Sequence, residues 1–139
     1  MAASGVEKQL VEKLRDVPLF HQTTKKQRRT LARLGKVLEW KAGTTAIKQG
    51  TRGAAFFLIL DCSVDVIADG TKVARLNDGD FVGEIALIEN APRNADVVAV
   101  NDTTVFAFSR GGLAAALETE PKMGMALLQA MASRRNVTQ

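Results

Sequence analysis

The segment "GDFVGEIALIENAPRNAD", residues 79–96, places the carboxylate of Glu84 and a single guanidinium, that of Arg93, in a stretch rich in small and apolar side chains. Glu84 only accepts hydrogen bonds when it is ionised, which suits a hydroxyl group, whereas Arg93 can hold an anion by charge-assisted, bidentate contacts. Gly83 permits a close backbone approach, and one helical turn after it would turn the free N–H groups of residues 85–87 toward the same anion. An anion and a hydroxyl together indicate a sugar phosphate.

The same two charges have a plainer interpretation, as exposed residues at the ends of a surface turn. A sequence as short as G-E-I-A-L is not specific by itself. Whether Glu84 and Arg93 form a site therefore depends on the elements that position them.

Length and composition predict one folded domain over residues 1–139. The chain has 46% hydrophobic and 24% charged residues and no low-complexity tract, which is enough for a single hydrophobic core. No apolar run approaches the roughly 20 residues of a membrane helix, and the N-terminus lacks the apolar core of a signal peptide. We therefore expect a cytoplasmic protein without a membrane segment.

Nineteen Lys and Arg against fifteen Asp and Glu give a net charge of +4, which suits an anionic partner. Part of this excess is the basic run Lys25, Lys26, Arg28 and Arg29, which is typical of a solvated helix face. The run has no interleaved aromatic residues and no helix-turn-helix follows, so the pattern disfavours nucleic acid.

The single cysteine, Cys62, excludes an intrachain disulfide, and the single histidine, His21, disfavours a metal site built from several soft ligands. No Ser or Cys with an acid stands in a defensible arrangement around His21. We therefore expect no metal, no cofactor and no enzymatic activity.

The positioning elements fall into three parts. Apolar residues recur at helical spacing over residues 6–14, while Thr24 and Gln27 have capping-box spacing and Gly35 is placed to end the second helix. These signals predict a helical lead over residues 1–35.

Residues 36–109 change to short runs rich in Val, Ile, Phe and Thr that are separated by glycine turns, as expected for a sandwich or barrel. Asp69-Gly70 between two such runs predicts a tight hairpin. "GGLAAALETE" and a segment opened by Pro121 predict helices over residues 110–139. The expected fold is mainly β with flanking helices: a jelly-roll-like antiparallel β-roll, N-terminal helices and C-terminal lid helices.

The whole arrangement resembles the cyclic nucleotide-binding domain family, and residues 79–96 resemble its phosphate-binding cassette. The resemblance extends over "VPLF", "AGTTAIKQG", "FFLIL", "LNDGDFVGEIALIENAPRNADVVA" and "TTVFAFSRGGL". It implies that Glu84 holds the ribose 2′-hydroxyl, that Arg93 pairs with the cyclic phosphate, and that the backbone of residues 83–86 completes the cradle. In some family members a residue of the closing helix caps the base, which implies a lid. The implied ligand-binding residues are Phe81, Val82, Gly83, Glu84, Ile85, Ala86, Arg93, Asn94, Ala95, Arg134 and Arg135.

Three positions depart from the family pattern. Cys62 stands in a turn where glycine is usual, and Val82 stands where an aromatic residue is common. Asn94 follows the arginine in place of Ser, Thr or Ala, and because a hydroxyl there often helps bind cGMP, its absence favours cAMP; an asparagine could also bind the phosphate or a guanine. We therefore expect cAMP as the ligand, with cGMP as the alternative.

The resemblance implies a regulatory sensor that signals to an unidentified effector by movement of its helices. One alternative is the sensory half of a catabolite-activator-type transcription regulator, which needs a DNA-binding module after the closing helix; the sequence ends at Gln139 without one. The other is a degenerate family member that no longer binds cyclic nucleotide.

Overall fold

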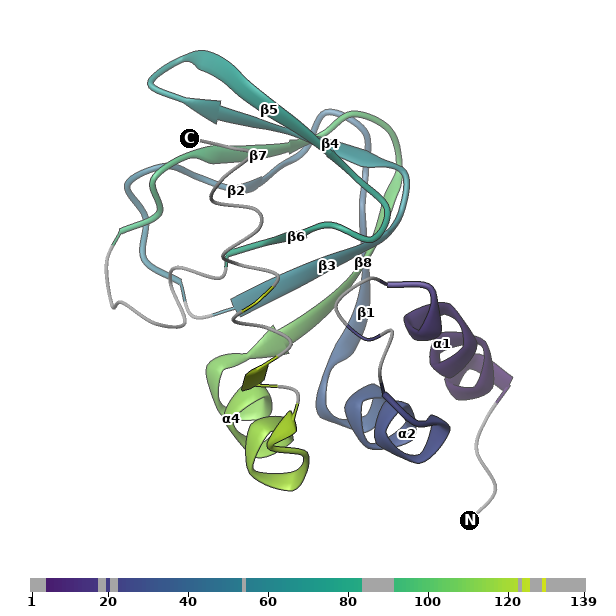
Figure 1. Ribbon diagram of the computed structural model, residues 1–139. Coiled ribbons are helices and arrows are strands. Elements are labelled where there is room, and N and C mark those ends of the chain that lie inside the picture. The colour runs from purple at the N-terminus through teal and green to yellow at the C-terminus, as the bar shows by residue number, and fades with distance from the viewer. Residues whose placement is uncertain are drawn as a thin grey trace.

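The computed structural model describes residues 5–17, 20, 23–53, 55–83 and 92–122, together with residues 124, 125 and 129. Strands occupy the middle of the chain and helices stand before and after them (Figure 1). None of the helices in these described ranges is long and apolar enough to cross a membrane. The helices are α1 (Gly5–Arg15), α2 (Lys25–Leu34) and α4 (Arg110–Thr119). The strands are β1 (Lys36–Trp40), β2 (Thr45–Ile47), β3 (Ala55–Asp61), β4 (Ser63–Ala68), β5 (Thr71–Asn77), β6 (Phe81–Val82), β7 (Asp96–Ala99) and β8 (Thr103–Ser109).

The strands form two four-stranded sheets, with the orders β1-β8-β3-β6 and β2-β7-β4-β5, and the neighbouring strands pair antiparallel. The two sheets face each other, and the helices lie below the first (Figure 1). The β4–β5 hairpin turns at Asp69 and Gly70, whose φ angles of 52° and 78° are both positive, as in a two-residue type I′ turn. The predicted mainly β fold with flanking helices is confirmed, and β1 begins and β8 ends at the predicted limits of the roll.

Strands β3, β6 and β8 of the first sheet contribute buried residues to two clusters, one on each face, since alternate residues of a strand point to opposite sides. Along β3, Phe56 and Leu58 belong to a cluster shared with the helices, whereas Ile59 belongs to a cluster between the sheets. The helix-side cluster is Leu10, Val11, Leu14, Val17, Phe20, Leu31, Ala32, Phe56, Leu58, Leu60, Phe81, Phe106, Phe108 and Ala116. The inter-sheet cluster is Trp40, Ile47, Ile59, Val64, Leu76, Val82, Val97, Ala99 and Val105.

Helix α2 begins with the predicted capping box. The Thr24 hydroxyl accepts from the Gln27 N–H at 3.1 Å, and Gln27 Oε1 accepts from the Thr24 N–H at 2.8 Å. Gly35 ends the helix as predicted, but its φ of −137° is extended, so no left-handed conformation requires glycine there. A Cβ on Gly35 would lie 2.6 Å from the Ala107 carbonyl oxygen and 2.7 Å from Cζ of Phe106. The glycine is required by the close approach of the chain to β8.

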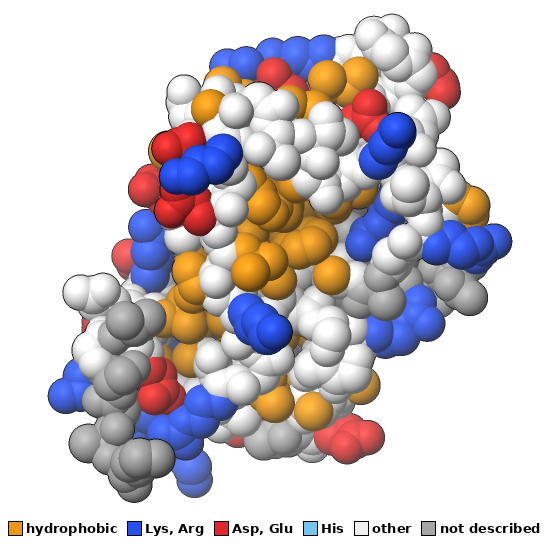
Figure 2. Space-filling view, turned by 180° about the vertical axis from the view of Figure 1, so that it is seen from behind, with side chains coloured by type: hydrophobic (Ala, Val, Ile, Leu, Met, Phe, Trp, Pro, Cys, Tyr) orange, Lys and Arg blue, Asp and Glu red, His pale blue; other side chains and the backbone are white. Residues whose placement is uncertain are grey.

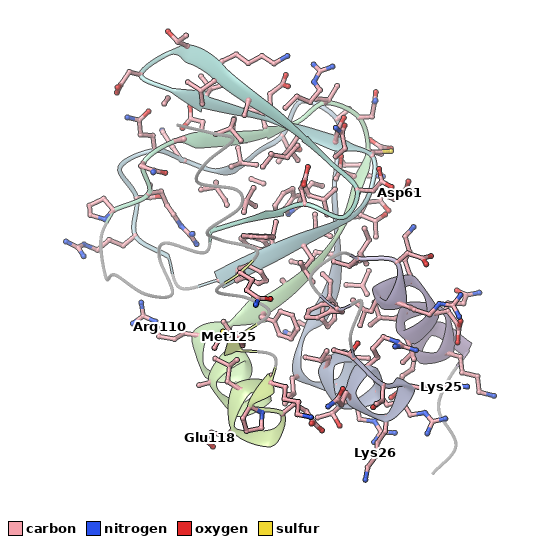
Figure 3. The ribbon with its side chains drawn as sticks, viewed as in Figure 1. Lys25, Lys26, Asp61, Arg110, Glu118 and Met125 are labelled. Carbon is pink, nitrogen blue, oxygen red and sulfur yellow. The ribbon has the colours of Figure 1, made fainter. Side chains whose placement is uncertain are left out.

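The basic run is not uniformly solvated, and the prediction is wrong for Arg28. Lys25 and Lys26 project away from the body of the protein (Figure 3), whereas Arg28 is only 7% exposed. Its Nη1 donates to the Thr23 carbonyl at 2.7 Å, and its Nε donates to the Val11 carbonyl of α1 at 3.2 Å. Arg28 lies one helical turn before the buried Leu31, so it faces α1 and joins the two helices.

We expect Arg28→Ala to lower the free energy of unfolding by roughly 1.5–3 kcal/mol, because two carbonyls lose a charged donor in a buried setting. Arg29→Ala is the matched control, since Arg29 is an exposed neighbour on the same helix, and we expect a change within about 0.5 kcal/mol. Denaturant unfolding of both variants measures the difference. Equal losses would show that Arg28 contributes no more than a surface charge.

Candidate functional site

Arg93 precedes β7, and its backbone is hydrogen-bonded to the connection between β2 and β3. Its N–H donates to the Thr51 carbonyl at 2.8 Å, and its carbonyl accepts from the Gly50 N–H at 2.8 Å. These two bonds fix the Cα of Arg93 relative to the roll. Only the side-chain torsions then decide where the guanidinium lies.

The Arg93 guanidinium is anchored by backbone carbonyls from two neighbouring strands. Nη2 donates to the Ala55 carbonyl at 2.9 Å, and Nη1 lies 3.4 Å from the Gly83 carbonyl. Ala55 opens β3 and Gly83 directly follows β6, and these two strands pair with each other. The positive charge is therefore held, half-buried, across one end of this strand pair.

Gly83 occupies a position that admits no side chain. Its φ is 88°, in the left-handed region that favours glycine. A Cβ there would lie 2.7 Å from the Ala55 carbonyl oxygen and 2.7 Å from Arg93 Nη1. The chain at Gly83 therefore lies close to β3 and to the arginine, and the predicted approach of its backbone to an anion stays a prediction.

Phe81 and Val82 point to opposite faces of the first sheet. Phe81 is 6% exposed and packs in the helix-side cluster, with its ring centroid 5.4 Å from that of Phe56. Its side chain therefore has a packing role, and a ligand contact of Phe81 stays a prediction. Val82 is 3% exposed in the inter-sheet cluster and so faces the roll interior.

Of the other predicted ligand-binding residues, Ala95 is buried and Asn94 is exposed beside Arg93. The remaining five lie outside the described residues, and their contacts stay predictions: Glu84, Ile85, Ala86, Arg134 and Arg135. Met125, from the predicted lid segment, is 61% exposed and lies beside α4 (Figure 3).

Cys62 takes the conformation that glycine would take in the β3–β4 turn. Its φ is 71°, which a residue with a Cβ adopts at a cost of roughly 1–2 kcal/mol. Asp61 Oδ1 accepts from the Cys62 N–H at 3.1 Å. The turn therefore keeps a backbone suited to glycine, and the cysteine is accommodated within it.

Apolar side chains also gather near the level where the two sheets face each other. Figure 2 shows them grouped in the middle of the rear face, with Lys and Arg side chains around them. Three hydrophobic residues packed on the inter-sheet cluster are only partly buried: Ala46, Phe57 and Val66. The roll thus offers apolar surface as well as a fixed positive charge.

Sequence reasoning missed the residues that support Arg93. In the sequence Gly50 and Gly53 are only two glycines of the predicted turns, and the carbonyl acceptors of Thr51, Ala55 and Gly83 have no signature, since every residue carries a carbonyl. The turn glycines were the one available signal. They did not show which side chain would lie against them.

A helix-flanked roll of two antiparallel sheets, with an arginine fixed at the end of a strand pair, defines a class of ligand-binding regulatory domains. The chain belongs to the cyclic nucleotide-binding domain family, because residues 37–120 match that family's sequence model. The family resemblance seen in the sequence is thereby confirmed.

Individual relatives agree with this assignment. The chain is 37% identical over 108 residues to a cAMP-dependent protein kinase regulatory subunit of Mycosarcoma maydis, covering 74% of this chain and 21% of that protein. A solved cyclic nucleotide-binding domain from Methylobacillus flagellatus superposes with a TM-score of 0.82 at 25% identity, covering 96% of this chain and 80% of that one. The Thermus thermophilus catabolite activator protein gives a TM-score of 0.78 at 26% identity, covering 86% and 58%. The chain thus spans about a fifth of the kinase subunit's length.

Proposed function

We propose that this chain is a sensor domain that binds cAMP and transmits binding to an effector through its helices, without catalysing a reaction. The observation that carries the proposal is the Arg93 guanidinium, held by the Ala55 and Gly83 carbonyls at the end of the β3–β6 pair. A fixed cation and partly open apolar surface on the same roll suit a ligand with a phosphate at one end and a flat base at the other.

Anchoring of Arg93 before the ligand arrives favours binding. An arginine side chain loses about 0.5–1.5 kcal/mol of conformational entropy when it is immobilised at an interface. Here the backbone bridge to Gly50 and Thr51 and the two carbonyl contacts have already restricted it. A guanidinium carries five N–H donors in a planar fork, and this geometry matches the oxygens of a phosphate.

The residues that would contact the other parts of the ligand are assigned from the family resemblance and from the chemistry of their side chains. Glu84 would accept from the ribose 2′-hydroxyl, and the N–H groups of residues 83–86 would complete the phosphate cradle. Asn94 in place of a hydroxyl residue supports cAMP over cGMP. The M. maydis relative, whose name specifies cAMP dependence, points the same way.

Calorimetric titration with cAMP and cGMP side by side tests the proposal. We expect both ligands to bind and cAMP to bind more tightly. If neither nucleotide binds at millimolar concentration, the chain is a degenerate family member. If cGMP binds more tightly than cAMP, the proposed base preference is wrong.

We expect Glu84→Gln to weaken cAMP and to have little effect on 2′-deoxy-cAMP, because the proposed partner of the carboxylate is the 2′-hydroxyl alone. A hydrogen bond to a charged group contributes roughly 1.5–3 kcal/mol, so the cAMP loss should be about 10- to 100-fold. Titration of both ligands into both proteins isolates this one contact. Equal losses for the two ligands would mean that Glu84 acts through local structure.

The helices are joined to one another by a polar contact that would carry the signal. Gln27, whose Oε1 completes the α2 capping box, donates from Nε2 to Glu120 Oε2 at 2.7 Å. Glu120 is the residue that follows α4 and precedes Pro121. This hydrogen bond would therefore transmit a movement of the C-terminal segment to the start of α2.

We expect the backbone amides that follow Pro121, as far as Arg135, to exchange slowly with solvent only when cAMP is bound, because binding shifts the population toward a closed lid. Hydrogen exchange with and without the nucleotide measures this difference, and amides of β3 serve as the internal control. Equal protection in both states would mean that the closing helix is fixed packing, and would remove Arg134 and Arg135 as base caps.

The sensory half of a transcription regulator remains the second candidate. The T. thermophilus catabolite activator protein shares this fold over 86% of the chain. Both candidates predict the same nucleotide site, so they differ only in the effector that the helices contact.

A further inference from the structure

The turn that precedes β3 is held rigidly by its own hydrogen bonds. The Lys48 carbonyl accepts from the Thr51 N–H at 3.2 Å and from the Thr51 hydroxyl at 2.6 Å. Asp96 Oδ1 accepts from the Gln49 N–H at 2.6 Å, and the Gln49 amide exchanges two hydrogen bonds with Asp69, at 2.7 and 2.9 Å. The turn is thus fastened to β7 and to the β4–β5 hairpin.

This same turn holds the backbone of Arg93, as described above, through the carbonyl of Thr51 and the N–H of Gly50. The arginine and residues 48–53 therefore form one unit, in which the backbone is fixed and the side-chain torsions of Arg93 determine where the guanidinium lies. A group that the turn places beside the guanidinium therefore limits which of these torsions are possible.

Gly53 is the residue of the turn that lies against the guanidinium. A Cβ built on Gly53 would lie 2.9 Å from Nη2, 3.2 Å from Nε and 3.5 Å from Cζ of Arg93, and no other residue supplies its three nearest atoms. The φ of Gly53 lies outside the left-handed region, in contrast to that of Gly83, so an alanine is compatible with its backbone. The Arg93 guanidinium therefore occupies the volume that a side chain on Gly53 would need.

A methyl group at Gly53 would move a side chain and not the backbone. A contact under 3.0 Å forces one partner to move, and here the partner is the end of a flexible side chain, whereas at Gly83 it includes a backbone carbonyl. A methyl group on Gly53 would displace the guanidinium from the Ala55 carbonyl and leave the strands in place.

We propose that Gly53 is a positioning residue for anion recognition: its lack of a side chain determines where the Arg93 guanidinium lies, and hence the geometry with which the domain holds a phosphate. The part that concerns the phosphate rests on the proposed function. The part that concerns the guanidinium rests on the contacts alone. Gly53 does not itself contact the ligand in this proposal.

The test is Gly53→Ala in the complete chain, with Gly111→Ala as the matched control, because Gly111 also has no left-handed φ and its nearest neighbour would be 4.0 Å away. Two quantities are measured: the position of the Arg93 Nε–Hε cross-peak in ligand-free NMR spectra, assigned by its loss in Arg93→Lys, and the affinity for cAMP. We expect Gly53→Ala to shift the cross-peak. We also expect it to lower the affinity for cAMP by about tenfold, because one charge-assisted contact is misplaced. Gly111→Ala should change neither quantity. Thermal unfolding of both variants is followed as well, because the Ala55 carbonyl loses a donor when the guanidinium is displaced, and alanine stabilises a helix such as α4 relative to glycine.

A double variant separates positioning from general disruption of the turn. In an Arg93→Ala background, Gly53→Ala should cause no further loss of affinity, because the group that it displaces is already absent. An equal additional loss there, or an unchanged Nε–Hε cross-peak, would overturn the proposal. If the parent protein binds no cyclic nucleotide, the proposed function fails, while the cross-peak still decides whether Gly53 positions Arg93.

Discussion

Replacing Arg93 with alanine is expected to weaken cAMP binding by roughly 10- to 100-fold, because a charge-assisted contact of about 1.5–3 kcal/mol is deleted. The guanidinium is already oriented by the Ala55 and Gly83 carbonyls and by the backbone bridge to residues 50–51, so its contribution is not reduced by an ordering cost at binding. Calorimetric titration of the variant and the parent measures the loss.

Two controls define what that loss means. Arg93→Lys keeps the charge but not the planar fork, and should recover only part of the affinity. Arg29→Ala removes an exposed arginine on α2, far from the site in sequence, and should leave affinity unchanged. Unfolding of Arg93→Ala must also be followed, because the Ala55 carbonyl loses a donor. Unchanged cAMP affinity in Arg93→Ala would remove this residue from the phosphate site.

Replacing Gly83 with alanine is expected to reduce both stability and binding. A left-handed φ costs a residue with a Cβ roughly 1–2 kcal/mol, and overpacking adds about 1–3 kcal/mol. The φ of 88° and the 2.7 Å approach of a Cβ to the Ala55 carbonyl oxygen bring both costs to one position. The backbone that follows Gly83 carries the predicted phosphate cradle, so cAMP affinity should fall as well.

Gly43→Ala is the matched control for the backbone cost. Gly43 has a φ of 83°, but nothing lies within 4 Å of a Cβ built on it. Its loss in the free energy of unfolding measures the left-handed conformation alone. The excess loss in Gly83→Ala then measures the contact with β3 and Arg93. Equal losses in the two variants would show that the strand and the arginine yield to a methyl group without cost.

The sequence by itself determined those features that depend on neighbouring residues. The α2 capping box needs only Thr24 and Gln27 three positions apart, and the β4–β5 turn needs only Asp69 and Gly70, which tolerate a positive φ. The limits of the roll at residues 36 and 109 followed from the change in side-chain pattern. The resemblance of residues 79–96 to a phosphate-binding cassette was equally local, and it identified Arg93 before any partner of that residue was known.

Tertiary structure alone decided the environment of individual side chains. Arg28 looked like one of four solvated cations, and only the packing of α1 against α2 gave it the Val11 carbonyl as an acceptor, in addition to the nearby Thr23 carbonyl. Phe81 lies in the cassette but packs on Phe56, because alternation along β6 turns it toward the helices.

The contacts that hold Arg93 are the clearest case of an environment that the sequence does not show. Ala55 is 38 positions away from it in the chain, and Gly53 is 40. Ala55 acts through a carbonyl oxygen, which every residue carries. Gly53 acts, in our proposal, through its missing side chain, which the sequence shows without showing what lies against it. Such contacts exist only once β3, β6 and the turn at residues 48–53 have been brought together, so the sequence identified the charged residue and the fold determined what holds it.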